Sequence, residues 1–234
     1  MDHPEHLRIG ALVFPEMDQI DLTGPFEVLS RLPDSKFHLL WKAATPVRDL
    51  QGLILTPEMS IAEAPPLDLL VVPGGWGQER LMEDEAVLGF IRRHAVQGGY
   101  IFSVCTGALI CGAAGVLRGV KCTTHWAAFH LLKYFGAIPM EARVVIDGKH
   151  VSAAGVTAGI DGALRVASLL RGREIAEQIQ LSIEYAPEPP FSSGTPQTAS
   201  AEVLHRVQAS YRQITERRIA TARRYAQRFG IETV

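Results

Sequence analysis

Short apolar runs rich in β-branched residues alternate along the chain with longer stretches of helical periodicity. The clearest runs are Leu7–Phe14, Phe37–Ala44, Asp68–Gly75, Tyr100–Val104 and Arg143–Gly148. Several lack polar alternation, as is typical of parallel strands that are buried on both faces. The alternation predicts an α/β fold: a single flavodoxin-like three-layer α/β/α domain with a mostly parallel sheet.

Helices are expected between and after these strands, each bounded by Gly, Pro or a polar cap. They cover Leu22–Arg31, Glu79–Gln97, Thr106–Val116, His125–Phe135, Thr157–Leu170 and Glu174–Ile183. A Pro-, Ser- and Gly-rich loop over Tyr185–Ser200 precedes a long basic helix, Ala201–Phe229. We expect residues 1–198 to form the α/β domain and residues 199–234 to form a C-terminal helix packed on the domain or on a dimer partner.

Charge and composition limit the possible partners. The chain has 23 basic and 25 acidic residues, for a formal net charge of −2, so no overall field attracts nucleic acid or an anionic membrane. The basic terminal helix makes DNA binding an alternative function. A helix-turn-helix, however, needs a second, recognition helix after a short turn, and we expect none after this helix. No apolar stretch approaches the roughly 20 residues that span a bilayer, and no secretory signal is visible. With three cysteines in no paired spacing, we expect a cytoplasmic protein without a metal site.

Cys105 stands where the strand Tyr100–Val104 passes directly into a helix, in the stretch SVCTGAL. A nucleophile elbow has the order strand, nucleophile, small residue, Gly and helix, and it exposes the side chain of the nucleophile above the sheet edge. The helix amino terminus favours a thiolate, so we expect a lowered pKa for Cys105. The alternative is a buried structural cysteine, the role expected of Cys111 and Cys122.

Three further groups are candidates to work with Cys105. The backbone N–H groups of Gly75, in VVPGGWG, and of Thr106 are candidate donors to charge on a bound substrate. Asp21, in DLTGP, lies between apolar residues, where burial raises a carboxyl pKa towards a working value; it is equally a helix cap. His125, in TTHW, is the second candidate for a base, or a polar residue at a helix start.

These motifs together resemble the PfpI-like branch of the class I glutamine amidotransferase superfamily, and within it the isocyanide hydratases. The resemblance runs from about Leu7 to Phe229 through DLTGP, PGG, SVCTGALICGAAG, TTHWA, TAGID and EYAPEPPF. It implies a nucleophile at Cys105, its acidic partner at Asp21 and a neighbouring hydroxyl at Thr106. It also implies hydration of an isocyanide, R–N≡C, to an N-substituted formamide through a cysteine thioimidate, in a homodimer that needs no cofactor.

The resemblance adds pocket candidates and one departure. The candidates to line the pocket are His125, Trp126, Ala154 and Val156. Ala154 and Val156 stand where the family can carry Gly and Ile, so packing against the Cys105 helix, and the motion of that helix, are expected to differ. Two other functions remain open: a glyoxalase-like or amidase activity that uses Cys105 with His125, and a non-enzymatic sensor such as the ligand-binding half of an AraC-class regulator.

Overall fold

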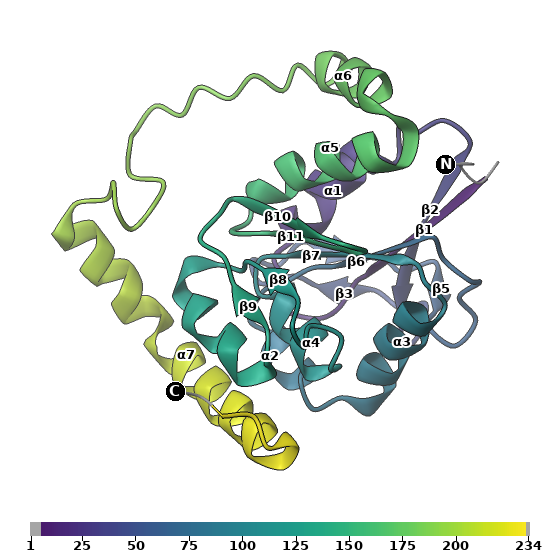
Figure 1. Cartoon of the computed structure of the whole chain (residues 1–234). Coiled ribbons are helices and arrows are strands. Elements are labelled where there is room, and N and C mark those ends of the chain that lie inside the picture. The colour runs from purple at the N-terminus through teal and green to yellow at the C-terminus, as the bar shows by residue number, and fades with distance from the viewer. Residues whose placement is uncertain (1–5, 233–234) are drawn as a thin grey trace.

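A seven-stranded sheet forms the centre of the computed structural model, which describes residues 6–232 (Figure 1). The strand order is β10-β11-β7-β6-β1-β2-β5, and every neighbouring pair is parallel except β10 and β11. The strands are β1 (Leu7–Leu12), β2 (Ser35–Trp41), β5 (Met59–Ser60), β6 (Leu69–Val72), β7 (Tyr100–Val104), β10 (Val144–Asp147) and β11 (His150–Ala153). The predicted mostly parallel sheet is confirmed.

Helices cover both faces of this sheet, as Figure 1 shows. One layer contains α1 (Ile20–Leu29), α5 (Ala158–Arg171) and α6 (Arg173–Ser182). The other contains α2 (Gln78–Leu81), α3 (Glu85–Val96), α4 (Gly107–Ala113) and η1, a 3₁₀ helix over Trp126–Phe135. Two small ribbons pair β3 (Val47–Arg48) with β4 (Ile54–Leu55) and β8 (Lys121–Cys122) with β9 (Ile138–Pro139). The three-layer fold class is confirmed.

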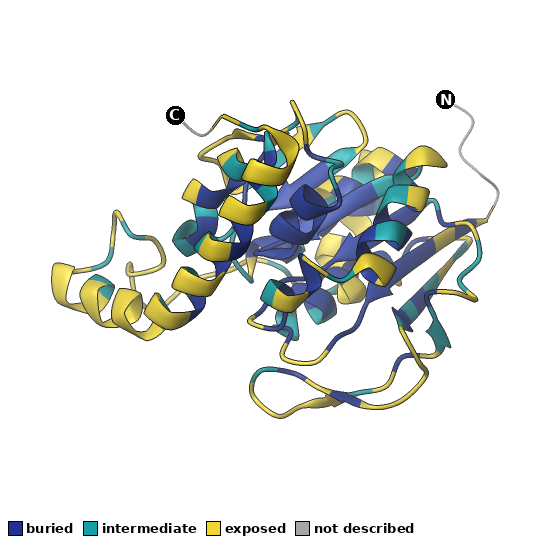
Figure 2. Ribbon diagram, turned by 90° about the horizontal axis from the view of Figure 1, so that it is seen from below, coloured by how far each residue is buried: buried dark blue, intermediate teal, exposed yellow. Residues whose placement is uncertain are grey.

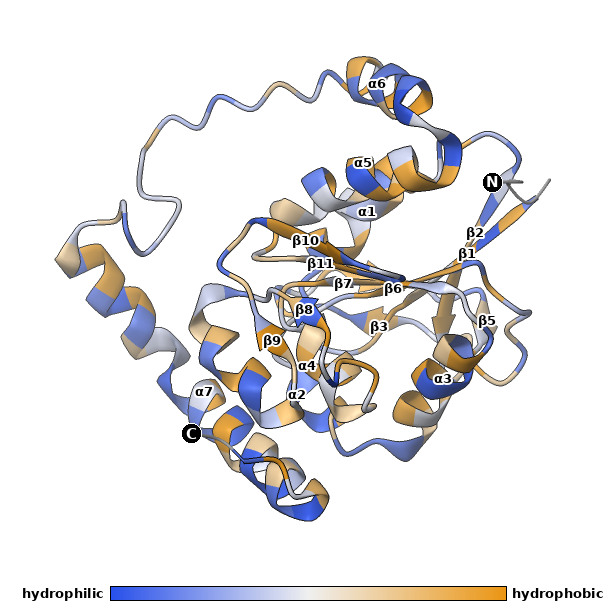
Figure 3. Ribbon diagram, in the orientation of Figure 1, coloured by the Kyte–Doolittle hydropathy of each residue, from blue (hydrophilic) through white to orange (hydrophobic). Residues whose placement is uncertain are grey.

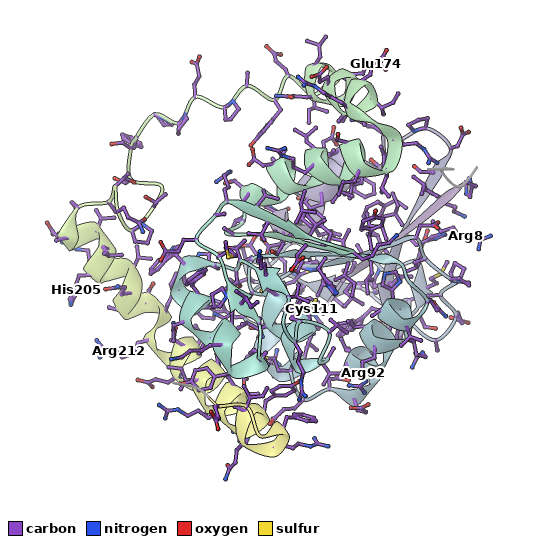
Figure 4. All side chains as sticks on the ribbon, viewed as in Figure 1. Arg8, Arg92, Cys111, Glu174, His205 and Arg212 are labelled. Carbon is purple, nitrogen blue, oxygen red and sulfur yellow. The ribbon has the colours of Figure 1, made fainter. Side chains whose placement is uncertain are left out.

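Burial explains the apolar runs of the sequence. All four residues of β6 and four of the five residues of β7 are buried, because helices lie on both sides of these strands. Figure 2 shows the sheet as the buried centre of the molecule, and Figure 3 shows that its central strands are largely hydrophobic. Cys111 and Cys122 are fully buried, and Cys111 lies inside the domain on α4 (Figure 4). Their predicted structural role agrees with this placement.

Two local predictions are wrong. The single helix expected over Glu79–Gln97 is two helices, because Asp84 takes an extended conformation and caps α3 by accepting a hydrogen bond from Val87 N–H (3.4 Å). The sequence analysis also missed β11. Its residues, His-Val-Ser-Ala, contain a single β-branched aliphatic side chain, and pairing with β7 and β10 on either side makes this segment a strand.

The long terminal helix, α7 (Ala201–Phe229), has the predicted bounds. Ser200 caps its start, and Gly230 ends it in a left-handed conformation. Its second half packs on η1 and α2, whereas its first half is mostly exposed (Figure 2). Residues 184–200 reach α7 as a largely exposed loop that runs outside the three layers (Figure 1). The helix therefore packs on its own domain; the division at residue 198 stays a prediction.

Candidate active site

Four neighbouring strands end at one edge of the sheet. β11, β7, β6 and β1 are adjacent and parallel, so the loops that follow their carboxyl ends come together. These loops bring Val156, Cys105, the pair Gly74 and Gly75, and Asp21 into one cluster. Cys105, Gly75 and Asp21 are the residues expected from the sequence to work together, and the topology explains why they meet.

Cys105 occupies a strained turn between β7 and α4. Its φ angle is +55°, a left-handed conformation that is uncommon for a residue with a side chain. Two hydrogen bonds hold this turn: Cys105 N–H donates to Ala153 O (3.0 Å), and the Thr124 hydroxyl donates to Cys105 O (2.6 Å). The geometry is that of the predicted nucleophile elbow, although the cysteine itself is only 6% exposed.

Asp21 is fully buried in the first turn of α1. Its Oδ2 accepts a hydrogen bond from Gly74 N–H (2.9 Å), its Oδ1 is buried without a hydrogen-bond partner among the described residues, and the Cys105 thiol acts to lower the pKa of the carboxyl group. Burial, together with the nearby Asp18 carboxylate, raises the pKa of Asp21 from 3.8 to about 8. The prediction that burial raises this pKa is confirmed, whereas Asp21 is not the cap of α1, because the N-cap residue of this helix is Gln19.

The lowered pKa predicted for Cys105 is wrong. Burial, with the neighbouring Asp21 carboxylate, raises the pKa of the thiol well above its usual value. The backbone N–H groups of Thr106 and Val156 and the Arg218 guanidinium act in the opposite direction, but they do not outweigh burial. Cys105 and Asp21 therefore each keep a proton to higher pH than usual, and they titrate as one buried pair.

The hydrogen bonds of the glycine loop after β6 differ from those predicted. Gly75 N–H donates to the Thr106 hydroxyl (3.1 Å) and already has a partner, so it is not a free donor for a substrate. Gly74, which the sequence analysis did not single out, donates to Asp21 instead. A Cβ on Gly74 would lie 2.5 Å from Thr106 N and 3.0 Å from Asp21 Oδ2, so only glycine permits this approach. The doubled glycine of VVPGGWG was the available signal.

His125 does not form a pair with Cys105. Its Nδ1 accepts a hydrogen bond from Ala127 N–H (3.3 Å) as the cap of η1. Burial, with a contribution from the Arg218 charge, lowers the pKa of His125 to about 4. Within residues 6–232, no hydrogen bond joins this imidazole to the thiol. The ring packs instead with Trp126 and with Tyr211 of α7, at centroid distances of 5.3 and 5.7 Å.

Ala154 and Val156 follow β11 beside the elbow. Ala154 N–H donates to Arg143 O (2.9 Å), and Val156 has a φ angle of +22° while its N–H faces the Cys105 sulfur. Val156 therefore lies next to the thiol, as predicted. It also lines a cavity of about 480 Å³, together with Asp18, Gln19, Ile20, Asp49, Leu50, Gln51 and Leu53.

α7 contributes a residue that the sequence analysis missed. Arg218 is only 5% exposed and donates to Gly75 O (2.6 Å) and to the Thr106 hydroxyl (3.4 Å). In the sequence it is one of several arginines on a basic helix, 113 positions after Cys105, and spacing gives no reason to distinguish it. The residues that the structure describes contain neither a helix long and apolar enough to cross a membrane nor a cluster of three metal-ligating side chains.

Comparisons with known proteins agree with this geometry. The sequence model of the DJ-1/PfpI family matches residues 7–169. The chain is 52% identical over 198 residues to isonitrile hydratase from Pseudomonas putida, across 85% of this chain and 87% of that enzyme. It is 38% identical to a ThiJ/PfpI family protein from Pseudomonas syringae of known crystal structure, with a TM-score of 0.91 over 94% of this chain and 93% of that one.

A regulator is also among the relatives. The chain is 32% identical over 179 residues to the HTH-type transcriptional regulator GbdR from Pseudomonas aeruginosa. The match covers 73% of this chain and 48% of the regulator.

Proposed function

The chain belongs to the DJ-1/PfpI family, and on that premise we propose that it is a lyase that hydrates isocyanides to N-substituted formamides. The observation that carries the proposal is the buried pair of Cys105 and Asp21 at the elbow, in a chain 52% identical to an isonitrile hydratase. The reaction needs a nucleophile and one group that gives and then takes a proton, and this pair supplies both.

The first step joins the isocyanide to the cysteine. The Cys105 sulfur, after its own proton has left to solvent, attacks the terminal carbon of R–N≡C and forms an S–C bond, and Asp21 delivers its proton to the same carbon. The product is a thioimidate, S–CH=N–R, with the Asp21 carboxylate left ionised. A carboxyl group with a pKa of about 8 carries this proton at neutral pH, which an exposed aspartic acid does not.

The second step adds water. The ionised Asp21 takes a proton from a water molecule as its oxygen bonds to the thioimidate carbon; the C–S bond then breaks, and the nitrogen gains a proton. The products are HC(=O)–NH–R and the free cysteine, so the net reaction is addition of one water to one isocyanide. Gly74 N–H, bonded to Asp21 Oδ2, orients the carboxyl group through both steps.

The surroundings of the pair fit an apolar, neutral substrate. Val156, Ile20, Leu50 and Leu53 give the neighbouring cavity several apolar walls, which suit the R group of an isocyanide. The alternative Cys-His chemistry has less support, because a His125 with a pKa of about 4 is a weak base and has no hydrogen bond to the thiol. A ligand-sensing role, suggested by the regulator among the relatives, predicts binding without turnover.

We also propose that the protein is a cytoplasmic homodimer that needs no cofactor. The first half of α7 exposes the apolar side chains Val203 and Val207, which suit a second copy of the chain. All three cysteines are free thiols, in keeping with a reducing compartment. Light scattering of the purified protein across concentrations tests the dimer; a monomer mass at all concentrations contradicts it.

The decisive experiment is turnover of an aromatic isocyanide by the purified protein, with formamide measured by absorbance and mass spectrometry. We expect turnover by the wild type, none by Cys105→Ala, and a covalent adduct on the Cys105 peptide when the reaction is stopped by acid. Cys111→Ala, on the helix that follows the elbow, is the matched control and should retain activity. Binding without turnover in the wild type would favour a sensor, and turnover by Cys105→Ala would exclude the thioimidate.

A further inference from the structure

Arg218 carries a buried positive charge to the elbow from the far end of the chain. Its Nε donates to Gln78 Oε1 (2.9 Å), and its Nη2 donates to Gly75 O (2.6 Å) and to the Thr106 hydroxyl (3.4 Å). The guanidinium thus joins α7 to α2, to the glycine loop after β6 and to the residue after the nucleophile. All three acceptors are neutral oxygens.

The charge of this guanidinium has no carboxylate partner among the described residues. Other arginines of α7 form salt bridges on the surface, Arg206 with Glu202 and Arg224 with Glu83. Arg218 forms none within residues 6–232, and the nearby Glu79 accepts a hydrogen bond from the Thr221 hydroxyl (2.8 Å). A buried cation without an opposite charge is costly, so a partner anion is expected close to it.

We infer that Arg218 is a positioning residue of the proposed hydratase site: its guanidinium fixes the glycine loop and the Thr106 hydroxyl, and its charge stabilises the negative charge that forms when the pair of Cys105 and Asp21 loses a proton. The inference deepens the proposed function, because it identifies the group that permits an anion in a buried pair. Once the pair has lost its first proton it has a net charge of −1, and the guanidinium, which donates to the adjacent Thr106 hydroxyl (3.4 Å), supplies a charge of +1.

The hydrogen bonds connect Arg218 with the acid as well as with the thiol. Arg218 holds Gly75 O, Gly75 N–H donates to the Thr106 hydroxyl, and the preceding Gly74 N–H donates to Asp21 Oδ2. Moving the guanidinium therefore shifts the loop that orients the carboxyl group. Thr106 takes part in the same network, which gives its hydroxyl a role in positioning.

The groups whose charges act on Arg218 or on the pair come from every element packed around them. They are Asp18 and Asp21 before and within α1, Glu79 on α2, Cys105 at the elbow, His125 before η1, and Tyr211 and Arg217 on α7. Removing the charge of Arg218 removes the cation that lowers the pKa of the Cys105 thiol. The thiolate should then form at higher pH.

The test measures alkylation of Cys105 by iodoacetamide against pH, followed by mass spectrometry of the peptide that contains Cys105, so no isocyanide is needed. We expect Arg218→Gln to move the midpoint upward by about one pH unit, which lowers the rate near neutral pH about tenfold. Arg218→Lys keeps the charge and should keep the midpoint within a few tenths of a unit. Arg212→Gln, at an exposed arginine of α7, is the matched control and should match the wild type.

Each outcome decides the inference. A folded Arg218→Gln protein with the wild-type midpoint overturns it. If Arg218→Gln does not fold, Arg218→Lys decides: a wild-type midpoint supports the role of charge, and a midpoint raised by a unit overturns it, because packing alone then explains the residue. Failure of the wild type to hydrate isocyanides leaves the alkylation result unaffected, so the proposed function and this inference fail separately.

Discussion

Replacing Asp21 with Asn should remove a loss of stability that the wild type undergoes as the pH rises from about 4 to about 8. The pKa of Asp21 is about 8 in the folded state against 3.8 for an ordinary aspartic acid, so the folded state holds a proton that the unfolded state has lost between these values. A raised folded pKa stabilises the fold below about pH 4, and this contribution is lost as the pH rises through about 8. Within this window the loss over two pH units is about 3 kcal/mol.

Asn has the shape of a protonated aspartic acid, and its oxygen can keep the hydrogen bond from Gly74 N–H. The Asp21→Asn protein should therefore lack this loss of stability. Between about pH 5.5 and pH 7.5, we expect its melting temperature to gain roughly 5–10 °C on that of the wild type. Calorimetry or circular dichroism at matched pH values measures this gain, with the exposed Asp34→Asn as the control. A difference that stays constant over the range refutes the raised pKa.

Three other predictions concern the same cluster. The alkylation rate of Cys105 in the wild type should rise as the pH passes about 8, where the buried pair begins to lose a proton; a rate already maximal at pH 6 would contradict the raised pKa values. Gly74→Ala should lower isocyanide hydration more than tenfold in steady-state assays while the protein stays folded, because the new Cβ would lie 2.5 Å from Thr106 N; unchanged kcat would show that the loop tolerates the shift. His125→Asn keeps a residue that caps helices and should retain most activity, and a loss of a hundredfold or more would restore His125 as the base.

The sequence predicts which loops form this site, because their positions follow from the topology of a parallel sheet. Parallel strands place their carboxyl ends at one edge, so Cys105, Asp21 and the glycine loop can be brought together from strand positions alone. The rule gives the edge but not the hydrogen bonds there. Gly75 N–H was expected to face a substrate and instead meets the Thr106 hydroxyl, a contact that depends on side-chain packing.

Arg218 and Tyr211 could not be found in this way. α7 belongs to neither the strand pattern nor the loops at the edge, and its docking depends on which of its faces meets η1 and α2. The helix pattern predicts an amphipathic face, but an arginine is assigned by default to the exposed side. Arg218 is buried because it satisfies acceptors that belong to distant segments, Gly75 O and Gln78 Oε1.

The pKa predicted for Cys105 is wrong because the effect of the helix amino terminus is smaller than the effect of burial. A helix amino terminus contributes about 0.3–1 kcal/mol at an exposed position, less than one pKa unit, and α4 has only seven residues. Burial of Asp21 next to the thiol is a larger effect, since it raises the pKa of that carboxyl from 3.8 to about 8. A free thiolate in the resting enzyme is therefore not required. The same burial that keeps the thiol protonated also keeps the acid protonated, so the sulfur attacks once the thiol proton has left, and Asp21 then gives its proton to the isocyanide carbon.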